Sequence, residues 1–173
     1  MSNPVLNAIA DRRSIRGYLP QQITQEQLDA LLKAAVESPS ARNAQPWHFT
    51  VVQNAQVIAE VNAEATRNLG REGDIFYGAP TVVFISCDAG GRWGRLDCGI
   101  ATQTLALAAH ALGLGSVILG LPEAAFTGAR AEEFNRLLKF PEGYSFAVAI
   151  AIGIPSTTKE AHPVAPDKID YVR

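Results

Sequence analysis

The spacing of apolar and polar residues predicts three helices in the first part of the chain. Asn3 can cap the first helix, which should end near Arg12. The capping box Thr24–Gln27 opens the second helix, which should stop before Pro39 because the residue preceding a proline is disfavoured in the α region. Asn54 can cap the third helix, whose apolar positions recur every three to four residues.

Four runs rich in β-branched and apolar residues predict strands, over residues 47–52, 81–87, 116–119 and 145–152. The run 81–87 is apolar enough for the centre of a sheet. A short helix that carries Phe134 is predicted between the last two runs. Because helices and strands alternate loosely along the chain, we expect an α+β or α/β sandwich.

The segment 96–112 differs from the other predicted helices because it carries almost no charge. A helix on the surface of a monomer shows a polar face, and this one shows little, so we expect it to be buried on most sides. In a chain of 173 residues, its outer side can be covered by a second subunit. Gly113 and Gly115 are expected to end the helix.

Composition and charge narrow the class of protein. The 173 residues suit a single domain over 1–173, and a hydrophobic share of 47% against 18% charged residues argues against global disorder. A net charge of −2 without a long basic block makes nucleic acid and anionic membranes poor partners. No signal peptide is evident, and Cys87 and Cys98 form no CxxC pair, so we expect reduced thiols in a cytoplasmic protein.

Four residues at the end of the first predicted helix could clamp a phosphate group: Arg12, Arg13, Ser14 and Arg16. Guanidinium groups bind phosphate through paired, charge-assisted hydrogen bonds, and a hydroxyl adds a donor. The alternative is that the cations gather there only because the helix dipole favours positive charge at a C-terminus. The spacing alone leaves both interpretations open.

The connection 38–47 could contact a planar ligand. Two prolines restrict its backbone, small residues allow a ring to approach, and Asn43 and Gln45 offer donors and acceptors for a heteroaromatic edge. An ordinary connection between a helix and a strand is the alternative.

No residues that commonly perform acid, base or nucleophilic chemistry cluster along the chain. His48, His110 and His162 lie far apart and have no Cys or carboxylate partners at zinc-binding spacing, so no metal site is predicted. The glycines of 113–120 follow a helix and precede a strand, the reverse of a dinucleotide-binding loop, although Gly120 would allow a ligand to approach closely. This pattern favours an enzyme whose cofactor carries the chemistry.

Six segments, in order and spacing, together resemble the nitroreductase family of FMN enzymes from about residue 5 to residue 155. They are Arg12–Arg16, Ser38–Trp47, Gly78–Pro80, Asp97–Gln103, Leu112–Ser116 and Ala151–Pro155. The resemblance implies an α+β fold, a three-layer α-β-α sandwich with a central, mostly antiparallel sheet flanked by helices. It also implies an intertwined homodimer with C-terminal strand exchange, FMN held between the subunits and NAD(P)H as the electron donor.

The same resemblance assigns residues of this chain to the cofactor. The FMN phosphate, ribityl chain and pyrimidine edge would be held by Arg12, Arg13, Ser14 and Arg16, with Arg16 supporting the reduced flavin. The opposite subunit would supply a loop that includes Pro39, Ser40, Ala41, Asn43 and Gln45. Backbone groups near flavin N5 would come from Ile118, Leu119 and Gly120. Gly153 and Lys159 would contact the phosphate, and in the stretch directly after Pro155, residues 156–165, the basic candidates are Lys159 and His162.

The resemblance further implies an NAD(P)H-dependent flavin oxidoreductase that passes electrons to small electrophilic acceptors, such as nitroaromatics or quinones, by a ping-pong mechanism. Flavin N5 would carry the chemistry, so no catalytic side chain and no metal is expected. Two alternatives stay open. One is a flavin-binding carrier or regulatory protein without turnover, and the other is a specialised flavin dehydrogenase or dehalogenase of the same fold.

Overall fold

The computed structural model describes residues 3–161, 163 and 166–173. Its helices are α1 (Pro4–Asp11), α2 (Gln25–Val36), α3 (Ala55–Leu69), α4 (Gly94–Ala111) and α5 (Ala131–Leu137), with 3-10 turns η1 (Ala41–Asn43), η2 (Leu121–Phe126) and η3 (Pro166–Lys168). Its strands are β1 (Trp47–Val52), β2 (Thr81–Asp88), β3 (Gly115–Leu119) and β4 (Tyr144–Gly153). The helices and strands expected from the sequence are confirmed, whereas the 3-10 turns were not expected.

Local signals begin and end the helices where the sequence predicts them. The Asn3 carboxamide oxygen accepts hydrogen bonds from the backbone N–H groups two and three residues later, at 3.0 and 3.2 Å. The capping box Thr24–Gln27 is formed, and Asn54 caps α3 in the same manner as Asn3. Gly113 ends α4 with a φ of 73°, as expected, whereas Gly115 is already the first residue of β3.

The strands form an antiparallel sheet in the order β1-β2-β4-β3. β2 and β4 lie at its centre and are buried along most of their length. Because side chains alternate between the two faces of a strand, Val82 and Phe84 enter one core while Val83 and Ile85 enter the other. The prediction that residues 81–87 form a central strand is confirmed.

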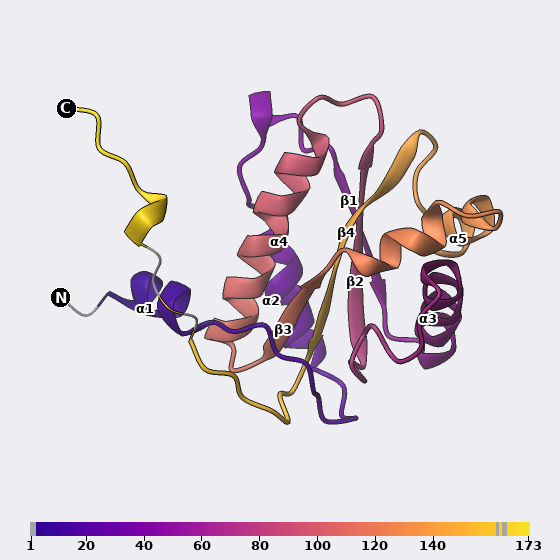
Figure 1. The fold of residues 1–173 in the computed structure, drawn as a ribbon, viewed down its shortest axis with the longest axis horizontal. Coiled ribbons are helices and arrows are strands. Elements are labelled where there is room, and N and C mark those ends of the chain that lie inside the picture. The colour runs from indigo at the N-terminus through magenta and orange to yellow at the C-terminus, as the bar shows by residue number, and fades with distance from the viewer. Residues whose placement is uncertain (1–2, 162, 164–165) are drawn as a thin grey trace.

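Helices cover both faces of this sheet (Figure 1). On one face, α2 and α4 bury Leu31 and Leu105. On the other face lie α3, α5 and η2, where the large buried side chains include Phe76, Phe84 and Phe134. The arrangement is the expected three-layer α-β-α sandwich around an antiparallel sheet.

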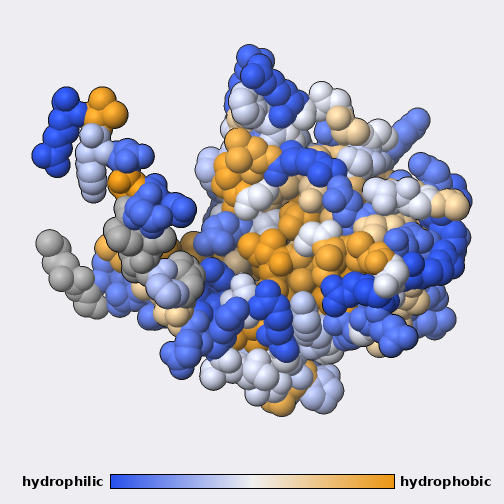
Figure 2. Space-filling model, viewed as in Figure 1, coloured by the Kyte–Doolittle hydropathy of each residue, from blue (hydrophilic) through white to orange (hydrophobic). Residues whose placement is uncertain are grey.

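The outer side of α4 is open in the single chain, so the expectation that a second subunit covers it stays a prediction about the assembled protein. Leu105 on its inner side is fully buried, but Leu96 is 58% exposed and Ile100 is 36% exposed. An apolar position looks the same in the sequence whether this chain or a second molecule covers it. Figure 2 shows apolar surface on the face where α4 and β3 lie. In the described part of the chain, no helix has the length and hydropathy needed to cross a membrane.

Both ends of the chain extend away from the sheet on the same side of the molecule (Figure 1). α1 buries none of its residues and exposes Leu6 and Ile9. After β4, the tail exposes Ile169, Tyr171 and Val172. Its described residues past Ser156 belong to no strand of the single chain. Strand exchange therefore stays a prediction about the assembled protein.

Candidate functional site

An extended segment after α1 runs along the beginning of β3. The backbone N–H of Ile15 donates to the carbonyl of Ser116 at 2.9 Å, and Ser14 forms a parallel bridge with Ser116. Further along, the carbonyl of Gly17 accepts a hydrogen bond from the N–H of Ser156 at 3.0 Å. Because backbone groups make these contacts, the segment has a defined path on which the arginine side chains are placed.

This segment, the end of α4 and the tail surround a pocket of about 360 Å³. The cations Arg12, Arg13 and Lys159 line it, together with Asp11, Ile15, His110, Gly113–Ser116, Pro155, Thr157 and Thr158. None of the three cations forms an ion pair with another described residue. The structure thus brings together cations from the two ends of the chain, and Asp11 is the one carboxylate among the described residues of this lining.

Sequence reasoning selected only part of this lining. Asp11, His110, Thr157 and Thr158 were not predicted as contacts. The sequence did contain a signal for the two threonines, because they directly precede Lys159. Hydroxyl donors beside a cation suit an anionic ligand. The remaining basic candidate, His162, lies outside the described residues.

Two hydrogen-bond donors at this pocket are buried and unused. The Nε atoms of Arg12 and Arg13 have no hydrogen-bond partner among the described residues. Arg13 donates from Nη1 to the carbonyls of Ala10 and Arg12, at 2.6 and 2.9 Å, which orients its guanidinium. A buried N–H without a partner is costly, and anionic oxygens can satisfy it with charge-assisted hydrogen bonds. The donor set therefore fits a phosphate group.

Three glycines near this pocket have different surroundings. A Cβ on Gly115 would come within 3.1 Å of side chains of the extended segment and the tail, so this glycine allows them to pack against β3. A Cβ on Gly153 would come within 2.9 Å of Pro80 and 3.0 Å of Tyr18, so packing alone accounts for this glycine, and its assignment to the phosphate stays a prediction. A Cβ on Gly120 would meet no atom of the described residues within 4 Å, which leaves open space at this position.

The edge strand β3 leads from the cation pocket to Gly120. Gly115 and Ser116 line the pocket where the strand begins. Five residues of strand span roughly 13 Å between the first and the last Cα. Along it, Ile118 is 41% exposed, whereas Leu119 is buried. The predicted phosphate contacts and the predicted ring contacts therefore lie toward opposite ends of one strand.

Arg16 lies outside the pocket that Arg12 and Arg13 line. Its side chain is exposed, and its guanidinium carbon lies 5.7 Å from the centroid of the Tyr77 ring. An extended backbone advances about 3.3 Å per residue, so Arg16 is displaced by roughly 13 Å from Arg12 along the segment. The predicted arginine group is thus divided between the pocket and a position near the turn before β2.

The loop 38–45 has a strained backbone. Three of its non-glycine residues have positive φ values: Arg42 (56°), Asn43 (55°) and Gln45 (46°). Within the loop, the Ser40 hydroxyl accepts a hydrogen bond from the N–H of Gln45 at 3.0 Å. From the first turn of α4, the Asp97 carboxylate accepts a hydrogen bond from the N–H of Ala41 at 3.1 Å. Left-handed conformations at residues other than glycine cost free energy and are concentrated at functional sites.

The loop 38–45 and the cation pocket lie at opposite ends of α4. Asp97, which binds the loop, is in the first turn of the helix, whereas His110 and Gly113 line the pocket at its other end. About thirteen residues of α-helix separate Asp97 from His110, which is roughly 20 Å. One chain therefore does not bring the loop to the pocket, and a site that uses both requires two chains.

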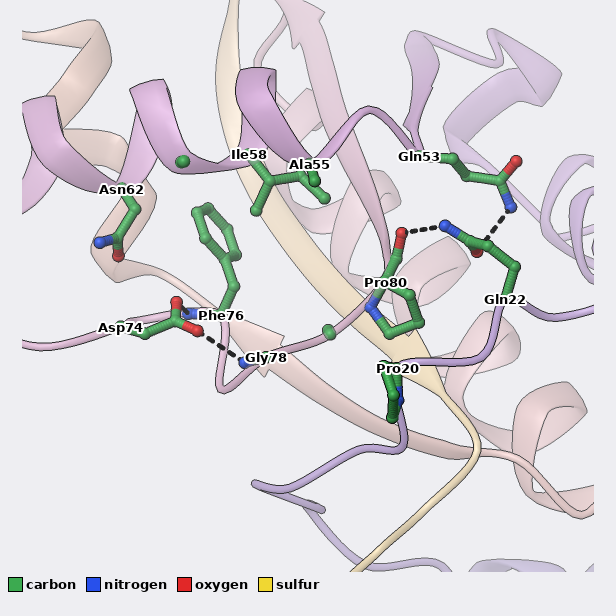
Figure 3. A pocket seen from close by; sticks show the side chains of 12 residues that line it. Pro20, Gln22, Gln53, Ala55, Ile58, Asn62, Asp74, Phe76, Gly78 and Pro80 are labelled. Carbon is green, nitrogen blue, oxygen red and sulfur yellow. Dashed lines mark hydrogen bonds between the residues drawn. The ribbon is translucent and has the colours of Figure 1, made fainter.

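A second pocket, of about 410 Å³, lies between α3 and the segment before β2 (Figure 3). Its lining includes the apolar Ile58 and Phe76 and the polar Gln22 and Asp74. Gln22 donates from Nε2 to the carbonyl of Pro80 at 2.6 Å, and the Asp74 carboxylate accepts from two backbone N–H groups. No Lys, Arg or His is among the described residues that line it, so this pocket does not suit a phosphate.

Cys87 and Cys98 are free and buried in the core between β2 and α4. Burial raises the pKa of both thiols, that of Cys98 to about 12. Because the thiolate is the nucleophilic form, such thiols are unreactive at neutral pH. The prediction of two unbridged core thiols is confirmed.

Comparison with known proteins found relatives over nearly the whole chain. A family model described as the nitroreductase family matches residues 9–154. The crystal structure of a nitroreductase with bound FMN from Desulfitobacterium hafniense DCB-2 has a TM-score of 0.94 and 37% identity, and covers 100% of both chains. A protein of Methanothermobacter thermautotrophicus, provisionally named NADH dehydrogenase/NAD(P)H nitroreductase, is 36% identical over 88% of this chain and 78% of its own length. An iodotyrosine deiodinase of Thermotoga neapolitana is 24% identical over 88% of this chain and 89% of its own length.

Proposed function

Because this chain belongs to the nitroreductase family, we propose that it binds FMN and acts as an NAD(P)H-dependent flavin oxidoreductase. The observation that carries the proposal is the pocket lined by Arg12, Arg13 and Lys159, where two buried guanidinium N–H groups lack a partner among the described residues. Such a donor set suits a phosphomonoester. The FMN bound in the relative from Desulfitobacterium hafniense supports FMN as the molecule that carries this phosphate.

In the proposed arrangement, Arg12, Arg13 and Lys159 hold the FMN phosphate and Ser14 lies beside the ribityl chain. The backbone of Ile118–Gly120, at the far end of β3, would border the flavin ring, and the open space at Gly120 would allow close approach. Arg16, further along the extended segment, would hold the pyrimidine edge of the ring. The spacing supports this arrangement, because the segment and β3 run side by side from the pocket.

A second copy of the chain is proposed to complete the site. Exposed apolar residues on two helices provide a surface for it: Leu6, Ile9, Leu96 and Ile100. A two-fold axis that pairs α4 with the partner's α4 in the opposite direction would bring the loop of one chain to the other end of the second. The residues proposed to cover the partner's flavin are then Pro39, Ser40, Ala41, Asn43 and Gln45.

Bound FMN supplies the redox chemistry, in which hydride is taken from NAD(P)H and electrons pass to the acceptor. The chain's own residues bind and orient the cofactor. The cations of the pocket neutralise the phosphate, and Arg16 places positive charge at the ring edge, where negative charge grows on reduction. The backbone of Ile118–Gly120 borders the face that donor and acceptor use. This scheme requires no acid or base side chain.

Small electrophiles such as nitroaromatics and quinones are the proposed acceptors, and the nitroreductase names of two relatives support them. The deiodinase relative favours a second candidate, a specialised dehalogenase, because it aligns with most of this chain. A flavin-binding carrier without turnover is the non-enzymatic alternative, since a site without catalytic side chains suits it equally well.

The test begins with the cofactor and continues with turnover. The purified protein should be yellow and should release FMN on denaturation. Its NAD(P)H oxidation should exceed that of free FMN at the same concentration when a nitroaromatic or a quinone is the acceptor. A protein that takes up no FMN would overturn the proposal. Flavin binding without turnover would indicate a carrier, and turnover with an iodophenol alone would indicate a dehalogenase.

The proposed shared face also predicts the kinetic pattern. If donor and acceptor occupy one face of the ring in turn, the mechanism is ping-pong. Double-reciprocal plots against NAD(P)H concentration, recorded at several acceptor concentrations, should then be parallel. Intersecting lines would indicate that both substrates bind together, and would contradict the shared face.

A further inference from the structure

The backbone of Tyr77, in the turn before β2, has an unfavourable conformation. Its φ is 58°, in the left-handed region, and Gly78 follows with a φ of 73°. Glycine adopts this conformation readily, whereas a bulky aromatic residue does not. The folded chain therefore holds Tyr77 against its own preference. Strain of this kind is typical of positions where the placement of a side chain matters.

Asp74 and the core impose this conformation (Figure 3). The Asp74 carboxylate accepts hydrogen bonds from the N–H of Phe76 at 2.8 Å and from the N–H of Gly78 at 2.6 Å. Ile75 and Phe76 are buried in the core, with 1% and 0% of their surface exposed. The chain is thus held on both sides of Tyr77.

This turn places the Tyr77 ring under the guanidinium of Arg16, at 5.7 Å from the ring centroid. A guanidinium within about 6 Å of an aromatic face is attracted by the ring quadrupole. Arg16 has few other contacts. Its Nη1 donates to the carbonyl of Ser14 at 3.5 Å, and it forms no ion pair with residues of the described ranges. In the described ranges, the Tyr77 ring and this weak hydrogen bond are therefore the polar and ring contacts that orient the Arg16 side chain.

Tyr18 joins the same group of side chains. Its hydroxyl donates to the carbonyl of Ile15 at 2.8 Å, which helps to hold the segment that carries Arg16. Burial raises the pKa of Tyr18, while the charge of Arg16 lowers it and Tyr77 raises it. The three side chains therefore lie close enough to share one electrostatic environment.

We propose that Tyr77 is a positioning residue for the cofactor: its ring, held by the Asp74 turn, fixes the Arg16 guanidinium at the pyrimidine edge of FMN. This inference rests on the proposed function, from which it takes the placement of the ring. A guanidinium that is already oriented loses less rotamer freedom when the cofactor binds. Its charge is also in place where negative charge develops on reduction.

The test is a double-mutant cycle between Tyr77 and Arg16. It measures the FMN affinity of the deflavinated full-length protein and the midpoint potential of the bound flavin. Tyr77→Asn removes the ring but tolerates a left-handed φ, Tyr77→Phe keeps the ring, and Arg16→Gln removes the charge. Lys139→Asn is the matched control, because Lys139 is exposed, has a φ of 55°, lies after α5 and is not among the residues proposed to bind FMN.

Tyr77→Asn should weaken FMN binding about two- to fivefold, the equivalent of an exposed cation–π contact. It should also make the midpoint potential more negative. Tyr77→Phe and Lys139→Asn should match the wild type, and Tyr77→Asn should have no further effect in the Arg16→Gln background. Two results would overturn the positioning role and leave the proposed function intact. One is an equal loss of FMN affinity from Tyr77→Asn in the wild-type and Arg16→Gln backgrounds, and the other is no loss in the wild-type background. A wild-type protein that takes up no FMN would overturn both.

Discussion

The guanidinium groups of Arg12 and Arg13 border a pocket and leave their Nε donors without a partner in the part of the chain that the structure describes. Such donors lower the stability of the protein without a ligand and strengthen the binding of an anion. At the scale of single residues, these unpartnered donors therefore lower the stability of the free protein and raise its affinity for an anion.

Arg12→Ala should weaken FMN binding about ten- to hundredfold, since a charge-assisted contact is worth roughly 1.5–3 kcal/mol. The melting temperature of the FMN-free protein should not fall, because the variant removes an unsatisfied donor. Fluorescence titration with FMN and thermal unfolding measure the two effects. Arg136→Ala is the control, because Arg136 is exposed on α5 and does not line the pocket. An unchanged affinity in Arg12→Ala would show that the phosphate binds elsewhere.

Cys98 makes stability depend on pH above neutrality. Burial raises the pKa of Cys98 from an ordinary value of 9.0 to about 12, so the unfolded chain ionises this thiol at a lower pH than the folded chain. Its contribution to stability is fully present below pH 9 and is lost as the pH rises toward 12, by up to about 1.4 kcal/mol per pH unit.

Urea unfolding at about pH 8 and about pH 10, with a reductant present, checks this effect. The free energy of unfolding should fall more steeply between these two pH values in the wild type than in Cys98→Ser, whose hydroxyl does not ionise in this range. If the free energy of unfolding fell equally in the two proteins, the thiol would ionise as easily in the folded chain as in the unfolded one.

At the scale of elements, α4 connects the core to the strained loop. Its inner side fills the core, while its first turn holds the loop 38–45 through Asp97. Asp97 is only 3% exposed, and the positive end of the helix dipole stabilises its charge. The conformation of the loop therefore depends on a carboxylate that belongs to another element.

Asp97→Ala should release the loop and lower stability by about 1–3 kcal/mol, because the Ala41 N–H loses its acceptor. Trypsin should then cleave faster after Arg42, which is exposed in the loop. Asp97→Asn keeps an acceptor oxygen and should change both quantities less. Limited proteolysis followed by mass spectrometry measures the cleavage rate. If Asp97→Ala is cleaved no faster than the wild type, the loop is held by its own contacts.

At the scale of the whole molecule, exposed apolar residues occur on α1, α4 and the tail, which extend from the side of the sheet away from α3 and α5 (Figure 1). If a second copy covers this side, it also brings the loop 38–45 to the proposed flavin. Because FMN would then bind only the assembled form, cofactor binding and dimerisation should be thermodynamically linked.

Deleting residues 160–173 should lower both the dimer affinity and the FMN occupancy, while Lys159 and the cation pocket are kept. The exposed Ile169, Tyr171 and Val172 are lost in this variant, and with them the proposed strand exchange. Sedimentation followed at a flavin absorption band measures both quantities together. A truncated protein that is a monomer and keeps full FMN would show that one chain builds the site by itself.

Much of the fold could be predicted because its signals are local. Helix caps act on backbone groups within a few positions of the chain. The structure forms the expected caps and helix ends at Asn3, Thr24–Gln27 and Gly113. The apolar run 81–87 likewise indicated a central strand, since burial on both faces requires apolar residues at successive positions. For the site, the cluster that begins at Arg12 was visible as charge, whereas Lys159 was found through the family resemblance alone.

The sequence by itself thus determined the elements and the main cations, whereas only the tertiary structure decided which residues meet. Lys159 and Arg12 line one pocket because the extended segment pairs with β3 and the tail follows β4, the neighbouring strand. Tyr77 is strained because Asp74 and the buried Phe76 hold the turn. The physical reason is that caps and periodicity depend on neighbours along the chain. The cation pocket and the Tyr77 turn depend instead on contacts between residues far apart in the sequence, which no local pattern encodes.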